Sequence, residues 1–152
     1  MSERDERYMR IAIEEALIAL EHGDVPIGCV LVHDDQVIAK THNCRELRRD
    51  ATAHAEIDAL RRGAEQLGDW RLDDCELYVT LEPCPMCAGA IVAHRIRRLV
   101  FGAWNTRAGA AGSLYNITDD PRLNHRVDVV RGVLAEECAA PMAGLFDELR
   151  LP

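Results

Sequence analysis

The chain has 152 residues, of which 48% are hydrophobic and 29% charged, a composition typical of a globular protein with its own core. Its formal net charge of −8 argues against non-specific coating of nucleic acid, because such binding depends on neutralising phosphates. No apolar run approaches the ~20 residues of a membrane helix, and the charged N-terminus lacks the apolar core of a signal peptide. We therefore expect one domain, residues 1–152, in the cytoplasm and without a membrane partner.

Hydrophobic periodicity and turn residues predict alternating helices and strands. Ser2 and Asp5 form a capping box for the first helix, and Thr52 is a suitable N-cap for the second. The predicted elements are, in order, a helix ending at Gly23, strands at 27–32 and 37–39, a helix from Thr52 through Leu60 that stops near Gly63, a strand at 76–81, a helix opened by Cys84 and Cys87, strands at 98–103 and 127–130, and a helix at 135–149.

This order predicts an α/β fold, a mixed five-stranded sheet with helices on both faces. The N-termini of the second and third helices should meet at one edge of the sheet, where ligand sites of α/β proteins are found. The glycine-rich stretch 104–124 is too long for a plain connection, which predicts a functional role for it.

Two of the six cysteines, Cys84 and Cys87, have the spacing of metal ligands. Residues three apart on a helix share a face, so both sulfurs can bind one ion. Pro85 suits the first helical position, and the helix N-terminus favours the thiolate that binds zinc. The other four cysteines are scattered and are expected to be buried thiols rather than half of a disulfide framework in a reducing compartment: Cys29, Cys44, Cys75 and Cys138.

His54 and Glu56 open the second helix and supply the rest of a catalytic zinc site. His54 with the two cysteines gives three protein ligands and one open position, the arrangement in which zinc lowers the pKa of a bound water toward ~7. Glu56, which is not a ligand, can move the protons of that water to a ring nitrogen and a leaving amine. Asp58 is the weaker candidate for this role because it lies further from the start of the helix.

Each part of this pattern has a plainer explanation when taken alone. A single histidine is more often a surface or core residue than a ligand, and Cys-x-x-Cys alone fits a redox pair equally well. The two motifs together, separated by one strand, are much more restrictive and form the signature of zinc nucleobase deaminases.

The sequence resembles the bacterial tRNA-specific adenosine deaminases over nearly its whole length. The similarity is carried by the segments Val25-Pro26-Ile27-Gly28, Asp50 to Glu56, Leu77 to Ala90, Gly109 to Leu114 and Asn124-His125-Arg126-Val127. The resemblance implies a cytidine-deaminase-like three-layer α/β/α fold and hydrolytic deamination of adenosine to inosine at the wobble position of a tRNA anticodon. It also implies a homodimer with one Zn²⁺ per subunit and the tRNA anticodon stem-loop as partner.

Carried over by position, the resemblance assigns Asn43 and the Ala55 backbone N–H to hydrogen bonds with the purine, and Ile27 and Leu81 to the pocket walls. A turn-forming asparagine is the plainer explanation of Asn43. His54, Cys84, Cys87 and Glu56 keep the roles already given.

The sequence departs from the family at Asn105, where an acidic residue is usual. Asn105 would contact the nucleotide with a weaker acceptor for a ribose hydroxyl, which leaves the preference for RNA over DNA open. Phe146 in the last helix is a candidate for stacking on an anticodon base, although a core role explains it as well. Two roles are open for Trp104, stacking on a flanking base and packing within the protein. Ala51 replaces a proline that is common in the family.

Two alternatives remain. A deaminase of free cytosine, cytidine or guanine would share the fold but needs a closed pocket. A structural zinc module that binds RNA needs a fourth protein ligand, for which Cys75, Cys44 and His94 lack convincing spacing. The arginine-bearing segments around residues 45–49, 95–98 and 107–126 leave a basic rim on the acidic body as a further possibility.

Overall fold

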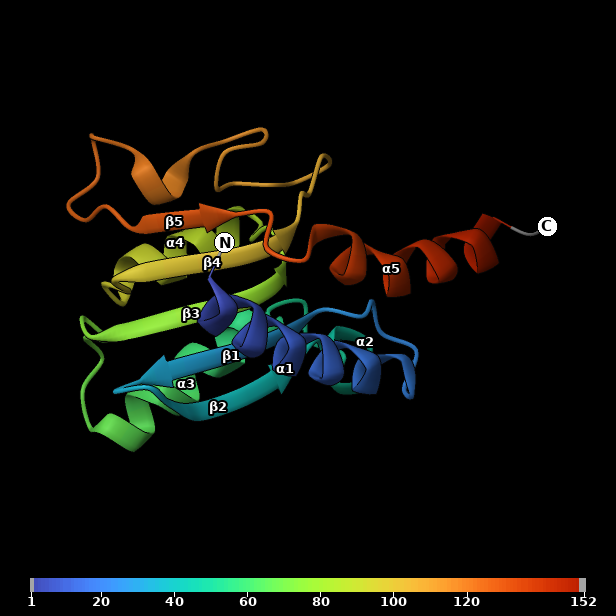
Figure 1. The fold of residues 1–152 in the computed structure, drawn as a ribbon, viewed down its shortest axis with the longest axis horizontal. Coiled ribbons are helices and arrows are strands. Elements are labelled where there is room, and N and C mark those ends of the chain that lie inside the picture. Colours follow the sequence, from blue (N-terminus) through green and yellow to red (C-terminus); the bar gives the residue numbers. More distant parts are fainter. Residues whose placement is uncertain (1, 151–152) are drawn as a thin grey trace.

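The computed structural model describes residues 2–150, with side chains described for residues 2–143 (Figure 1). Its elements are, in chain order, α1 (Glu3–Leu20), β1 (Gly28–His33), β2 (Gln36–His42), α2 (Arg45–Arg48), α3 (Ala55–Leu67), β3 (Cys75–Leu81), α4 (Pro85–Ala93), β4 (Arg98–Ala103), the 3₁₀ turn η1 (Ile117–Asp119), β5 (Asp128–Arg131) and α5 (Ala135–Arg150). Among these helices, none has the length and apolar character needed to cross a membrane.

The five strands form one mixed sheet in the order β2-β1-β3-β4-β5. β1 is antiparallel to both β2 and β3, whereas β3, β4 and β5 run parallel to one another. Parallel neighbours require a crossover, which α4 provides between β3 and β4. The second crossover is the long segment 104–127, which carries η1 and lies beside β5 in Figure 1.

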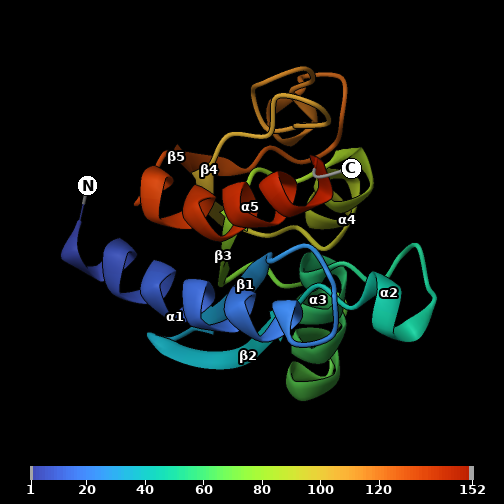
Figure 2. The ribbon, with the colours of Figure 1, turned by 90° about the vertical axis from the view of Figure 1, so that its right-hand side faces the viewer.

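Helices cover both faces of the sheet, as Figure 2 shows. Successive residues of a strand point to opposite faces. Val30 and Tyr78 accordingly pack in the core beneath α1 and α5, whereas Leu31 and Leu77 pack in the core beneath α3 and α4. The predicted fold class is therefore confirmed: a three-layer α/β/α arrangement around a mixed five-stranded sheet.

The second predicted helix has different boundaries in the structure. Its N-cap is His54 rather than Thr52, and it continues past Gly63 to Leu67. Gly63 lies inside α3 because the helix packs closely on β1, where a Cβ at this position would collide with Leu31. Gly68, with φ of 71°, is the residue that ends the helix. The predicted loop at 43–50 also contains the single turn α2.

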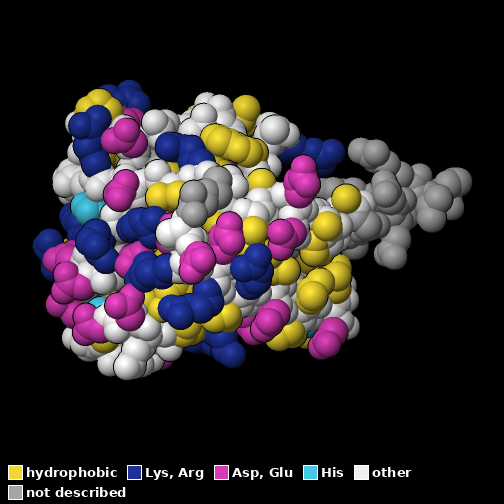
Figure 3. All heavy atoms as spheres, in the orientation of Figure 1, with side chains coloured by type: hydrophobic (Ala, Val, Ile, Leu, Met, Phe, Trp, Pro, Cys, Tyr) yellow, Lys and Arg dark blue, Asp and Glu magenta, His cyan; other side chains and the backbone are white. Residues whose placement is uncertain are grey.

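The arginines near the start of β4 face away from the predicted metal site. Arg98 donates to Asp5 and Glu76, and Arg4 and Arg97 also pair with Glu76. Glu76 is the second residue of β3, so this network lies at the edge of the sheet opposite the end of β3. On the face shown in Figure 3, basic and acidic side chains are interleaved. Because these arginines pair with Asp5 and Glu76, they form no separate basic rim.

Candidate metal centre

The N-termini of α3 and α4 bring the predicted ligands to one edge of the sheet. His54 is the N-cap of α3 and Cys84 the N-cap of α4, both with extended backbone. Pro85 starts α4, as its fixed φ favours, and Cys87 lies in the first turn. Cap residues lie at the helix end rather than on its side, which allows side chains from two helices to converge.

The three predicted ligands lie together. Nδ1 of His54 is 3.7 Å from the Cys84 sulfur and 3.4 Å from the Cys87 sulfur. Ligands of a tetrahedral Zn²⁺ are separated by about 3.3–3.8 Å, given bonds of roughly 2.0–2.3 Å. The spacing and the chemistry of this donor set therefore fit zinc.

The three groups also influence one another's protonation. The thiol of Cys87 donates to Cys84 and lowers the pKa of Cys84 to about 4, and the His54 ring acts in the same direction. The hydrogen bond with Cys84 in turn raises the pKa of His54. One sulfur is thus a thiolate, the form that binds metal.

Glu56 lies in the first turn of α3 and is only 4% exposed. Burial raises the pKa of Glu56 to about 7, so the carboxyl can take up and release a proton near neutrality. The weaker candidate Asp58 forms an ion pair with Arg48, which occupies its carboxylate.

Asn43, Ala55 and Ile27 lie at the same edge of the sheet. The side chain of Asn43 donates to the carbonyl of Val25 (3.2 Å) and accepts from the N–H of Arg45 (3.2 Å), so Asn43 does hold a turn. An amide has four hydrogen-bonding positions, and these two contacts leave two for a substrate. Ala55 is buried, and Ile27 packs partly buried against the core beneath α3.

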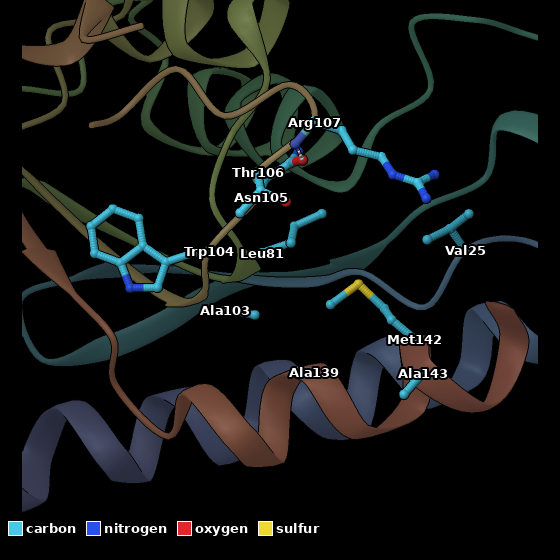
Figure 4. Close-up of a pocket in the computed structure, with 10 residues that line it drawn as sticks. All are labelled: Val25, Leu81, Ala103, Trp104, Asn105, Thr106, Arg107, Ala139, Met142 and Ala143. Carbon is cyan, nitrogen blue, oxygen red and sulfur yellow. Dashed lines mark hydrogen bonds between the residues drawn. The ribbon is translucent and has the colours of Figure 1, made fainter. Parts of the chain in front are cut away.

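A cavity of about 290 Å³ lies between β3, the segment after β4 and α5 (Figure 4). Leu81 and Asn105 line it, with Trp104 and Arg107 toward opposite ends and Met142 on the side of α5. Neither the three candidate ligands nor Asn43 are among its lining residues. Leu81 connects the two regions, because Cys84 follows it by three residues.

Asn105 and Trp104 both have partners within the protein. The side-chain oxygen of Asn105 accepts the N–H groups of Arg107 and Ala108, at 3.2 and 3.1 Å. Trp104 packs edge-on against Phe101 and still leaves 47% of its surface exposed, so it combines packing with an open ring face. The side chain of Phe146 lies outside the described residues.

Glu82 is a residue to which the sequence analysis gave no role. Its carboxylate is 1% exposed and accepts the N–H groups of Asn105 (3.1 Å), Ala111 (3.0 Å) and Ser113 (2.9 Å), as well as the Ser113 hydroxyl. Glu82 thus orders the glycine-rich segment beside the cavity. The small residues at 109–112 were the available signal, since exposed backbone N–H groups gather around anions.

None of the residues considered as a fourth protein ligand joins the group. Among the residues whose side chains are described, the potential metal ligands that lie together at this site are His54, Cys84 and Cys87. Cys75 begins β3 at the far edge of the sheet, and His94 follows the other end of α4, where it contacts the Trp70 carbonyl. A tetrahedral ion held by these three donors would therefore keep one position open.

Comparison with known proteins identifies relatives of this chain. A family model described as MafB19-like deaminase matches residues 3–150. A tRNA-specific adenosine deaminase of Bacillus subtilis is 49% identical over 97% of this chain and 91% of its own length. The tRNA-specific adenosine deaminase of Haemophilus influenzae is also 49% identical, over 98% of this chain and 87% of that protein.

Solved structures agree with this assignment. A structure from a study of A-to-I editing by tRNA:A34 deaminases at the wobble position superposes with a TM-score of 0.86 at 45% identity, covering 89% of this chain and 98% of that one. A guanine deaminase of Bacillus subtilis superposes with a TM-score of 0.65 at 32% identity, over 97% and 95% of the two chains. The chain therefore belongs to the family of tRNA-specific adenosine deaminases.

Proposed function

We propose that this protein converts adenosine to inosine by hydrolysis at the wobble position of a tRNA anticodon, using Zn²⁺ held by His54, Cys84 and Cys87. The observation that carries the proposal is the convergence of these three donors beside Glu56, a buried carboxyl group whose pKa of about 7 lets it gain or lose a proton near neutral pH. The names of relatives that share almost half of its residues support adenosine in tRNA as the substrate.

His54, Cys84 and Cys87 would hold the ion, which when bound would supply the Lewis acidity that makes a water molecule reactive toward the purine ring. Glu56 would take one proton from the attacking water and pass it to the ring nitrogen, and would then move the remaining hydroxyl proton to the departing amine. Its burial keeps its pKa near neutrality, so both transfers are possible without a large energetic cost.

The substrate base is held by the groups around the same edge. The two free positions of the Asn43 amide and the Ala55 N–H bind polar atoms of the purine, while Ile27 and Leu81 contact its faces. The cavity lined by Leu81, Asn105 and Arg107 accommodates flanking nucleotides, because its open, partly apolar walls suit stacked bases and phosphates. Phe146 is proposed as a further stacking residue.

The proposal includes a homodimer that acts in the cytoplasm, with one Zn²⁺ at this site in each subunit. Sedimentation equilibrium tests the dimer through the mass of the purified protein, which should be twice 17.0 kDa.

The function is tested by measuring inosine formation from an RNA anticodon stem-loop with a wobble adenosine. The same stem-loop in DNA, free adenosine, free cytidine and free guanine are the comparison substrates, and all are compared through the ammonia that they release, because cytidine and guanine yield uridine and xanthine rather than inosine. We expect turnover of the stem-loop RNA at least 100-fold faster than of any free base or nucleoside. Faster turnover of guanine would assign the chain to the free-base deaminases, for which the likeness to a guanine deaminase is the supporting observation.

A further inference from the structure

A second group of metal-type donors lies away from the site described above. One ring nitrogen of His22, one of His42 and the sulfur of Cys44 all lie within 4.8 Å of one another. The two imidazole rings have centroids 5.4 Å apart. His22 follows α1, His42 is the last residue of β2 and Cys44 precedes α2, so three segments of the chain meet here.

Both histidines are oriented by carboxylates. Nδ1 of His22 lies 2.7 Å from Oδ2 of Asp24, and Nδ1 of His42 lies 3.2 Å from Oε1 of Glu15. In metal sites, the ring nitrogen that does not bind the ion typically donates to a carboxylate in this way. The arrangement leaves Nε2 of each ring as the available ligand atom.

Nε2 of His22 is buried and has no hydrogen-bond partner, one of two such side-chain atoms among the described residues. A buried polar atom without a partner costs about 1–3 kcal/mol, so its persistence requires an explanation. An ion beside this nitrogen supplies the missing partner.

Cys44 provides the third donor. It is 8% exposed, and its thiol donates to the carbonyl of His42 at 3.4 Å. On metal binding the thiol proton passes to solvent and the sulfur becomes a thiolate ligand. Nitrogen and sulfur ligands of one Zn²⁺ lie about 3.3–3.8 Å apart, whereas the three donor atoms here lie within 4.8 Å of one another. Binding of an ion therefore requires these side chains to move closer together by about 1 Å.

We propose that His22, His42 and Cys44 form a second metal site, for a borderline-soft divalent ion such as Zn²⁺. Two neutral imidazoles and one thiolate form a donor set that binds zinc in preference to calcium or magnesium, because those two ions prefer oxygen ligands. Asp24 and Glu15 complete the site by balancing the charge of the ion from behind the rings.

The second site lies next to the substrate side of the fold. Asp24 also accepts the N–H groups of Glu46 and Leu47, at 2.6 and 3.1 Å, and Asn43 lies between two of the proposed ligands in sequence. An ion here cross-links the connection after α1 to the end of β2. Its expected effect is to stabilise the turn that holds Asn43, without participating in the chemistry.

The test is the metal content of purified protein loaded with Zn²⁺ and dialysed against a weak chelator, measured by inductively coupled plasma mass spectrometry. We expect two zinc ions per chain in the wild type and one in Cys44→Ser and His22→Asn. The asparagine keeps an N–H near the position of Nδ1, so the contact with Asp24 survives while Nε2 is lost. His33→Gln is the matched control, since His33 lies outside both groups, and should retain two ions.

One zinc ion per chain in the wild type would overturn the proposal, as would two in both variants. Circular dichroism checks that the variants are folded. If either variant is unfolded, the number of zinc ions bound per wild-type chain decides whether the second site exists. A second readout is the thermal midpoint, which should rise with added Zn²⁺ beyond one equivalent in the wild type and in His33→Gln, but not in Cys44→Ser or His22→Asn. Inosine formation is measured in parallel, so that failure of the proposed deaminase function is distinguishable from loss of the second ion.

Discussion

Replacing Glu82 by glutamine tests whether one buried carboxylate holds the segment beside the cavity. Oε2 accepts two backbone N–H groups and Oε1 accepts the N–H of Asn105 and the hydroxyl of Ser113. In Glu82→Gln, the amide oxygen can replace Oε2, and the Ser113 hydroxyl can rotate to accept from the new NH₂ group. The N–H of Asn105, however, meets another donor and loses its partner.

The expected cost follows from these contacts. One orphaned donor costs about 1–3 kcal/mol, and two charge-assisted bonds become neutral ones, for a total of about 2–4 kcal/mol. At about 2–4 °C per kcal/mol for a chain of this size, the thermal midpoint should fall by roughly 4–16 °C. Ser113→Ala is the control, because it removes only the hydroxyl contact and should cost about 1 kcal/mol.

The assay is thermal and urea unfolding followed by circular dichroism, at equal zinc content. If Glu82→Gln were as stable as the wild type, or more stable than Ser113→Ala, the carboxylate would not be organising this segment. We also expect a higher KM for the stem-loop RNA, because Asn105 lines the cavity and is positioned through its N–H.

Two further changes test the packing around α1. The hydrogen bond from Arg98 lowers the pKa of Asp5 to about 2, so this pair stabilises the fold above about pH 4 and the contribution is lost as the pH falls toward 2. The difference in unfolding free energy between wild type and Asp5→Asn, about 1–2 kcal/mol at pH 6, should therefore shrink at pH 2.5, and parallel pH profiles would contradict this. Gly28→Ala should lower the free energy of unfolding by at least about 3 kcal/mol, because the new Cβ would collide with the backbone of Ala12. Urea unfolding measures this cost, and a value below about 1 kcal/mol would show that α1 can move away from β1.

The sequence was informative wherever a local chemical rule applied. Pro85 and the cysteine spacing correctly placed the start of α4, and the order of elements correctly placed the N-termini of α3 and α4 at one edge. The boundary of α3 could not be predicted in the same way. Gly63 has the same local signature whether it ends a helix or allows close packing, and only the contact with β1 distinguishes the two.

The contacts between distant segments were also beyond prediction. Glu82 follows a strand without any periodic pattern, and its partners lie 23 to 31 residues further along the chain. His22 and Cys44 are likewise separated by a hairpin, so their proximity depends on the antiparallel pairing of β1 and β2. Such groups are visible only once the sheet has brought the segments together.

The central claim is that Glu56 moves protons beside a metal held by His54, Cys84 and Cys87. It is tested most directly by assaying inosine formation and zinc content together in Glu56→Ala, with the stem-loop RNA as substrate. The account predicts that the variant binds as much zinc as the wild type and forms inosine at less than a thousandth of its rate, since general acid–base catalysis contributes about 10²–10⁴-fold and the activated water has no other acceptor. Turnover close to that of the wild type at full zinc content would contradict it.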